Sequence, residues 1–151
     1  MTTNNSNNNL KLAYTILCDD VRLEVGNKLS LMGVFQNIMV QQIPVSLIKF
    51  AVVNHWQGGG GGVHLSEVRI LNDARTQPIV VSQPTRFEVT DGGFADNISF
   101  FVNVTFPEPG RYWIQTLVDS SLFDEFPLMI VEANNQMGMA DGGAGESETV
   151  N

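Results

Sequence analysis

The sequence has a single cysteine, Cys18, among its 151 residues. One cysteine allows no disulfide within the chain and no zinc site built from four thiolates. Cys18 continues an alternating run with Leu12, Tyr14 and Ile16, so we expect a buried thiol that packs as a small apolar side chain. A reactive nucleophile is the alternative interpretation of the same residue.

Charged residues are scarce, and basic ones are the scarcest. Charged residues make up 16% of the chain, whereas about 25% is usual in globular proteins. Eight basic residues against sixteen acidic ones give a net charge of −8. Because few side chains are available to neutralise phosphates, we expect no nucleic-acid partner and no attraction to an anionic membrane surface.

The sequence also lacks long apolar runs and a secretory leader. No stretch approaches the ~20 apolar residues that a membrane-spanning helix requires. Residues 1–9 contain neither a basic nor an apolar segment, so they do not resemble a signal peptide. We therefore expect a cytoplasmic protein with no membrane insertion.

Alternation of apolar and polar residues with a period of two is the dominant pattern. It is clearest over residues 98–106 and predicts a strand with these residues on its buried face: Ile98, Phe100, Val102, Val104 and Phe106. Other segments alternate in the same way, and almost none has helical periodicity. About nine strands at short spacing predict an all-β fold, a two-sheet antiparallel β-sandwich of the immunoglobulin-like or C2-like kind.

Turn-forming residues separate the predicted strands. Gly26 and Asn27 are typical of a two-residue hairpin turn. The strand that returns from this turn should be long, pass Gly33 at a β-bulge, and end near Pro44. Five consecutive glycines, Gly58 to Gly62, separate the alternating segments 47–57 and 63–71. We expect them to form the mobile tip of a hairpin, since the Lys and Ser or Thr of a phosphate-binding loop do not follow them.

The two ends of the chain differ from its middle. Residues 1–9 are mainly Thr, Asn and Ser, and residues 135–151 are rich in Gly and in acidic side chains. Both offer too few apolar side chains to offset the entropy of ordering, so we expect disordered tails. A single β-sandwich domain over residues 10–134 remains.

Motifs near both ends of this domain point to a family. Residues 19–22 read Asp-Asp-x-Arg, residues 26–35 read Gly-x-Lys-x-Ser-Leu-x-Gly-Val-Phe, and residues 109–112 read Pro-Gly-x-Tyr. The chain thereby resembles a family of small uncharacterised bacterial β-sandwich proteins. The resemblance implies the fold but no activity, and it places Tyr112 at a corner where its hydroxyl bonds back to a loop.

Three sets of residues are candidates for a ligand site. His55 and His64 flank the glycines and would face each other on paired strands, as two of the three or four ligands that zinc needs; two solvated histidines are the alternative. Six acidic residues would bind calcium if they met at one end of the sandwich, although turn chemistry also explains them: Asp19, Asp20, Asp91, Asp96, Asp119 and Asp124. Exposed aromatic residues would form a carbohydrate platform, with core packing as the alternative: Trp56, Trp113 and Phe94.

These observations favour a non-catalytic interaction module over an enzyme, with no catalytic, cofactor or metal residues assigned. No Gly-x-Ser-x-Gly motif is present. Several strands are apolar on both faces, which leaves a surface to be covered, so we expect a homo-oligomer or a complex with another protein. The outer-face residues behind this expectation are Phe101, Trp113, Leu117, Met129 and Val131. The alternative is a sandwich whose end loops bind calcium or carbohydrate.

Overall fold

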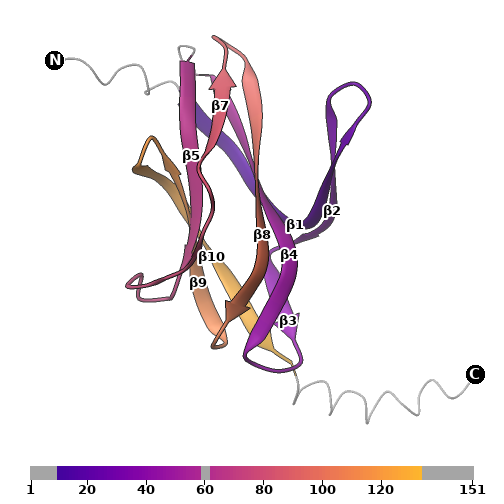
Figure 1. Ribbon diagram of the computed structural model, residues 1–151, viewed down its shortest axis with the longest axis vertical. Helices are drawn as coiled ribbons and strands as arrows, with labels where there is room; N and C mark the ends of the chain where they lie inside the picture. Colours follow the sequence, from indigo (N-terminus) through magenta and orange to yellow (C-terminus); the bar gives the residue numbers. More distant parts are fainter. Residues whose placement is uncertain (1–9, 59–61, 134–151) are drawn as a thin grey trace, which may run out of the picture.

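The computed structural model describes residues 10–58 and 62–133, and within them ten β-strands form two sheets (Figure 1). The strands are β1 (Leu10–Glu24), β2 (Lys28–Phe35), β3 (Asn37–Val40), β4 (Val45–Gly58), β5 (Gly62–Leu71), β6 (Pro78–Val81), β7 (Thr85–Val89), β8 (Phe94–Phe106), β9 (Gly110–Val118) and β10 (Ser121–Glu132). Sheet A has the order β2-β1-β4-β8, and sheet B the order β3-β10-β9-β5-β6, with β7 also paired to β5. The predicted all-β, two-sheet sandwich is confirmed.

The described residues form ten strands where about nine were predicted, and one predicted strand is divided between the sheets. The strand expected to run from residue 28 toward Pro44 is divided: β2 belongs to sheet A, whereas β3 belongs to sheet B and pairs with β10 in parallel. None of the described residues forms a helix that is long and apolar enough to cross a membrane. The predicted tails, residues 1–9 and 135–151, lie outside the described residues.

The core between the sheets is divided by a polar layer. A larger apolar cluster includes Phe50, Ile70 and Ile114, and a smaller one includes Trp56 and Phe87. Between them, four strands place polar side chains at inward positions, all buried: Asn54, Ser66, Asn97, Ser99 and Thr116. The side-chain oxygen Oδ1 of Asn54 accepts a 2.7 Å hydrogen bond from the Thr15 hydroxyl, which ties β4 to β1 within this layer.

The predicted register of β8 is wrong over its first part. Phe101 points into the core, whereas Phe100 and Val102 are 46% and 63% exposed; only Val104 and Phe106 are buried as predicted. The cause lies at Asn103, which has a left-handed φ of 55° and is missing from the ladder with β4. A left-handed residue interrupts the extended backbone, so the side chains before and after it alternate out of phase.

The β1–β2 hairpin bends away from sheet A. Its register is unchanged from the pair Leu17–Phe35 to the pair Glu24–Lys28, so Gly33 marks a kink rather than the predicted bulge. Gly33 has a φ of 69°. Residues 25–27 make the turn, one more than predicted. We call residues 20–32, beyond this bend, the arm; Figure 1 shows it rising beside sheet A as a separate ribbon.

The predicted tyrosine corner is confirmed. The Tyr112 hydroxyl donates a 2.6 Å hydrogen bond to the Glu108 carbonyl oxygen and accepts one of 3.1 Å from the Glu108 backbone N–H. Burial, partly offset by this contact with the Glu108 backbone, raises the pKa of Tyr112. The corner fixes the loop that leads from β8 in sheet A to β9 in sheet B.

Candidate functional site

The outer face of sheet A is apolar in its middle, and the arm covers it there. Two rows of paired residues cross β1, β4 and β8 there: Cys18–Ala51–Phe100 and Ile16–Val53–Ile98. Aliphatic side chains of the arm pack on these rows: Val21, Leu29 and Leu31. Cys18, Ala51 and Val53 are therefore buried although they lie on an outer face. Burial raises the pKa of the Cys18 thiol, as expected for a structural cysteine.

Beside the arm, edge strand β8 leaves two apolar side chains, Phe100 and Val102, exposed. The Lys49 ammonium lies 5.1 Å from the centre of the Phe100 ring and 3.0 Å from Asp20 Oδ1. The hydrogen bond from Lys49 lowers the pKa of Asp20. Residues 97–106 contain no charged side chain, and among the described strands none pairs with β8 on its second side. A charge-free edge strand with exposed apolar residues is a site prone to association.

The upper part of the same face is aromatic and acidic. His55 Nδ1 lies 2.7 Å from Asp96 Oδ1, and the Tyr14 ring stacks on the imidazole at 4.8 Å between centres. The Phe94 ring lies 5.5 Å from the imidazole on the other strand, β8. Burial and the charge of Asp96 raise the pKa of Tyr14. The imidazole is largely covered, whereas Tyr14 and Phe94 remain exposed.

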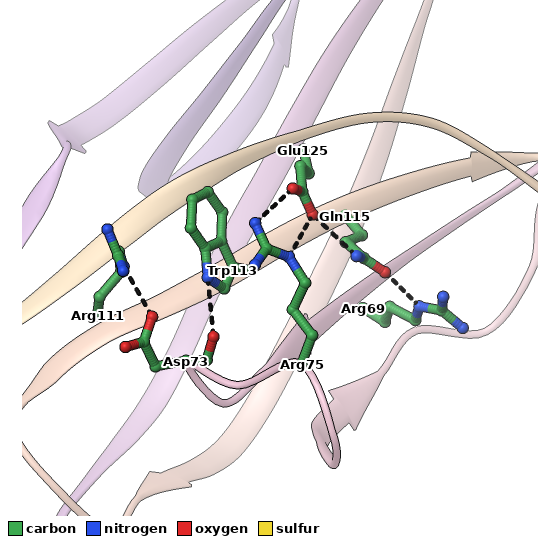
Figure 2. A network of polar contacts seen from close by, with 7 residues as sticks. All are labelled: Arg69, Asp73, Arg75, Arg111, Trp113, Gln115 and Glu125. Atoms are coloured by element: carbon green, nitrogen blue, oxygen red, sulfur yellow. Dashed lines mark hydrogen bonds and ion pairs between the residues drawn. The ribbon is translucent and has the colours of Figure 1, made fainter.

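On the outer face of sheet B, arginine side chains cover Trp113 (Figure 2). The guanidinium carbons of Arg75 and Arg111 lie 3.9 Å and 5.0 Å from the ring centre. The indole N–H donates to the Asp73 carbonyl oxygen at 3.2 Å, and Arg111 Nε donates to Asp73 Oδ1 at 2.7 Å. That bond from Arg111 lowers the pKa of Asp73. Two guanidinium groups therefore already lie against the Trp113 ring, where a stacked sugar would have to bind.

Arg75, and Arg69 beside it, are themselves held by acceptors on β10 and β9. Arg75 donates two hydrogen bonds to the Glu125 carboxylate, at 3.2 and 2.7 Å. Gln115 links Glu125 to Arg69, since its amide donates to Glu125 at 2.9 Å and accepts from Arg69 Nε at 2.8 Å. The bonds from Arg75 and Gln115 lower the pKa of Glu125. The hydrogen bonds of this cluster therefore join residues of β5, β9, β10 and the β5–β6 loop to one another.

The predicted pairing of His55 with His64 is wrong. The two strands that flank the glycines belong to different sheets, because β4 pairs with β1 and β8, whereas β5 pairs with β6, β7 and β9. His64 instead lies 2.9 Å from Asp119 Oδ2 through its Nδ1. Burial works against ionisation of Asp119, but the bonds from His64 and the Leu65 N–H together lower its pKa.

The predicted calcium ligands are dispersed. Asp20 contacts Lys49, Asp96 contacts His55, and Asp119 contacts His64, on three different parts of the fold. Over residues 10–58 and 62–133, no three His, Cys, Asp or Glu side chains gather closely enough to hold a metal ion. Trp56 is fully buried and stacks on Phe87 at 4.8 Å, so it belongs to the core. Of the predicted carbohydrate platform, only Phe94 is freely exposed.

A cleft of about 370 Å³ on the side of the sandwich was not indicated by the sequence. It lies where β1 and the β2–β3 connection face β10, and its lining is mainly apolar: Ile16, Leu17, Val34, Phe35, Phe126, Pro127 and Met129, with Thr15, Gln36 and Asn37. These residues come from separate segments, so no local pattern could have grouped them. The Thr15 hydroxyl is already bonded to Asn54, which leaves the cleft few polar anchors.

Comparison with known proteins places the chain in a family. A model of a family of unknown function, DUF6941, matches residues 13–131. The chain belongs to this family. The match agrees with the expected resemblance to a family without an assigned activity. No curated protein matches the sequence.

Two of the solved structures that are similar to this chain are larger proteins. The alkylpurine DNA glycosylase of Pseudomonas fluorescens, bound to DNA with an abasic-site analogue, matches with a TM-score of 0.51 and 8% identity over 82% of this chain and 30% of that one. A β-glucosidase from Listeria innocua matches with a TM-score of 0.48 and 9% identity, over 81% of this chain and 16% of that one. The chain spans less than a third of the length of either protein. At such identities the first likeness shows the fold alone, and the second adds nothing to it.

Proposed function

We propose that this protein is a non-catalytic interaction module that associates with itself through the outer face of sheet A and its edge strand β8. One observation carries the proposal: Phe100 and Val102 are exposed on an edge strand that has no charged side chain over residues 97–106. Native edge strands usually carry charges or prolines that prevent association. Their absence here favours a covered edge.

The energetics favour association if the rest of this face takes part. A stable interface buries about 800 Å² on each partner, more than two side chains provide. Tyr14 and Phe94 extend the apolar surface along the same face. Burial contributes about 25 cal/mol for each Å² of apolar surface. The net charge of −8 opposes association, but salt screens that repulsion beyond about 8 Å under physiological conditions.

Light scattering coupled to gel filtration tests the proposal at micromolar concentration. We expect a species larger than the 16.6 kDa monomer. Val102→Glu should convert it to the monomer, because a charge would be buried at the interface. Val81→Glu is the matched control, since Val81 is 47% exposed on β6 of the other sheet. If the unaltered protein is still monomeric at about 100 µM, its dissociation constant exceeds that value and self-association is refuted. If the two substitutions have equal effects on the oligomer, the proposed surface is refuted.

A further inference from the structure

The base and the tip of the arm differ in how they are packed. Val21, Leu29 and Leu31 pack on the outer face of sheet A. Leu23 and Val25, nearer the turn, are 71% and 92% exposed. A two-stranded hairpin is marginally stable alone, so two exposed aliphatic side chains at its end add no stability to the monomer. Figure 1 shows the end of the arm standing apart from both sheets.

The charge of the arm tip, residues 22–28, is opposite to that of the whole chain. The tip carries Arg22 and Lys28 against Glu24 alone, in a protein with a net charge of −8. The upper outer face of sheet A carries the complementary features. Asp96, which contacts His55, lies on this face with the exposed rings of Tyr14 and Phe94, and the exposed Asp91 lies in the turn that leads into β8. Lys11 lines a hollow beside Phe94, so two acidic side chains stand against one basic side chain here. An aliphatic, basic tip and an aromatic, acidic surface therefore occur on one molecule.

The arm does not bring these two surfaces together within one chain. The base lies on the middle rows of sheet A, and Leu23 and Val25 remain exposed in that arrangement. A second copy can bring the two surfaces together. Two copies related by a two-fold axis would form the same contact twice, once in each direction, as in most homodimers.

We infer that the arm tip of one copy docks on the upper outer face of sheet A in a second copy, with Leu23 and Val25 against Tyr14 and Phe94. Arg22 and Lys28 then face Asp91 and Asp96 of the second copy. This inference rests on the self-association proposed above and names the segments that carry it. The arm thus completes an interface that begins at the edge strand β8.

Engineered cysteines test the contact directly. A protein with both Leu23→Cys and Phe94→Cys should form a disulfide-linked dimer under mild oxidation, because the tip of one copy then meets residue 94 of the other. Each single substitution is the matched control and should give no such dimer. The native Cys18 is fully buried and does not compete. A disulfide within one chain, or no disulfide at all, would overturn the inference.

Charge exchange provides a second test that does not depend on oxidation. Arg22→Glu with Lys28→Glu makes the tip acidic, and Asp91→Lys with Asp96→Asn makes the upper face basic. Each double variant alone should dissociate at least about 10-fold more readily, because like charges then meet. An equimolar mixture should recover association, since each tip then meets a face of opposite charge. Arg86→Glu, on β7 of sheet B, is the control that alters net charge elsewhere.

The outcomes separate this inference from the proposed function. An oligomer that Val102→Glu disrupts, but that shows no cross-link and no recovery in the mixture, would contradict the docking of the arm and leave self-association standing. A monomeric unaltered protein would contradict both.

Discussion

The carboxylate of Asp19 occupies the space that a side chain on Gly33 would need. The two residues face each other where the β1–β2 pair leaves sheet A, and Gly33 adopts a φ of 69° there. The bend that sets the arm over sheet A therefore requires both a glycine conformation and the absence of a Cβ. Asp19 and Gly33 therefore set the position of the arm, and with it the part of sheet A that the arm covers.

Gly33→Ala should destabilise the protein more than Gly92→Ala. Both glycines have left-handed φ angles, 69° and 73°, but a Cβ on Gly92 meets open space. The left-handed conformation alone costs about 1 kcal/mol in an L-residue, and the collision with Asp19 should bring the total at Gly33 to about 2–4 kcal/mol. Urea unfolding measures both variants. Equal losses would show that the bend tolerates a displaced Asp19.

Phe101→Ala should cost about 3–5 kcal/mol of stability through the cavity it leaves. The Phe101 ring is buried and stacks on Phe50 at 5.1 Å. Its neighbour Phe100 is half exposed, so Phe100→Ala should cost about 1 kcal/mol. Unfolding at one matched protein concentration compares the two. The reverse order would restore the register predicted from the sequence.

Phe100 and Phe101 show which part of the fold the sequence pattern could not predict. Alternation predicted the strands and the sandwich because a strand buried on one face has apolar residues at every second position. It missed the change of phase at Asn103, since a left-handed φ at a polar residue leaves no mark in that pattern. Asn97 and Ser99 are polar but buried in the core, so their polarity wrongly assigned them to the outer face of the strand.

The candidate sites failed for a different reason: sheet membership is not local. His55 and His64 lie close in sequence, yet the connection between their strands crosses from one sheet to the other. The contacts of Trp113 with Arg75 and Asp73 join a strand to a loop about 40 residues away. By contrast, the Tyr112 corner was predictable because its partner Glu108 is four residues away.

Calcium should leave the melting temperature unchanged. A ligand that binds the folded state raises the melting temperature as its concentration rises. Calcium needs six to eight oxygen ligands, whereas Asp20, Asp96 and Asp119 each contact a different basic or imidazole group. A scan in millimolar CaCl₂, with MgCl₂ as the control for ionic strength, checks this. A rise specific to calcium would support the end-loop alternative.

Arg75→Gln should reduce the fall in melting temperature that the protein shows as the pH is lowered into the acid range. The pKa of Glu125 is lowered in the folded protein by the bonds from Arg75 and Gln115. Its contribution is therefore present above the unfolded pKa of about 4.3 and is lost as the pH falls through the lower, folded value. The two proteins should differ in melting temperature at pH 7, and the difference should shrink as the pH falls below about 4.3. Arg86→Gln is the control, and it should follow the unaltered protein at every pH.

Acrylamide quenching of tryptophan fluorescence should report the cover over Trp113. Trp56 is fully buried, so a quencher in solution reaches chiefly Trp113, which is partly exposed. The Arg75 guanidinium lies 3.9 Å from the Trp113 ring centre and shields one part of it. Arg75→Ala should therefore increase the quenching constant, by about 2-fold if the cation–π contact holds the arginine in place. Glu125→Gln should give a smaller increase, because it removes the charge that anchors Arg75 but not the side chain itself. Quenching that is unchanged in Arg75→Ala would show that the arginine leaves the ring open in solution.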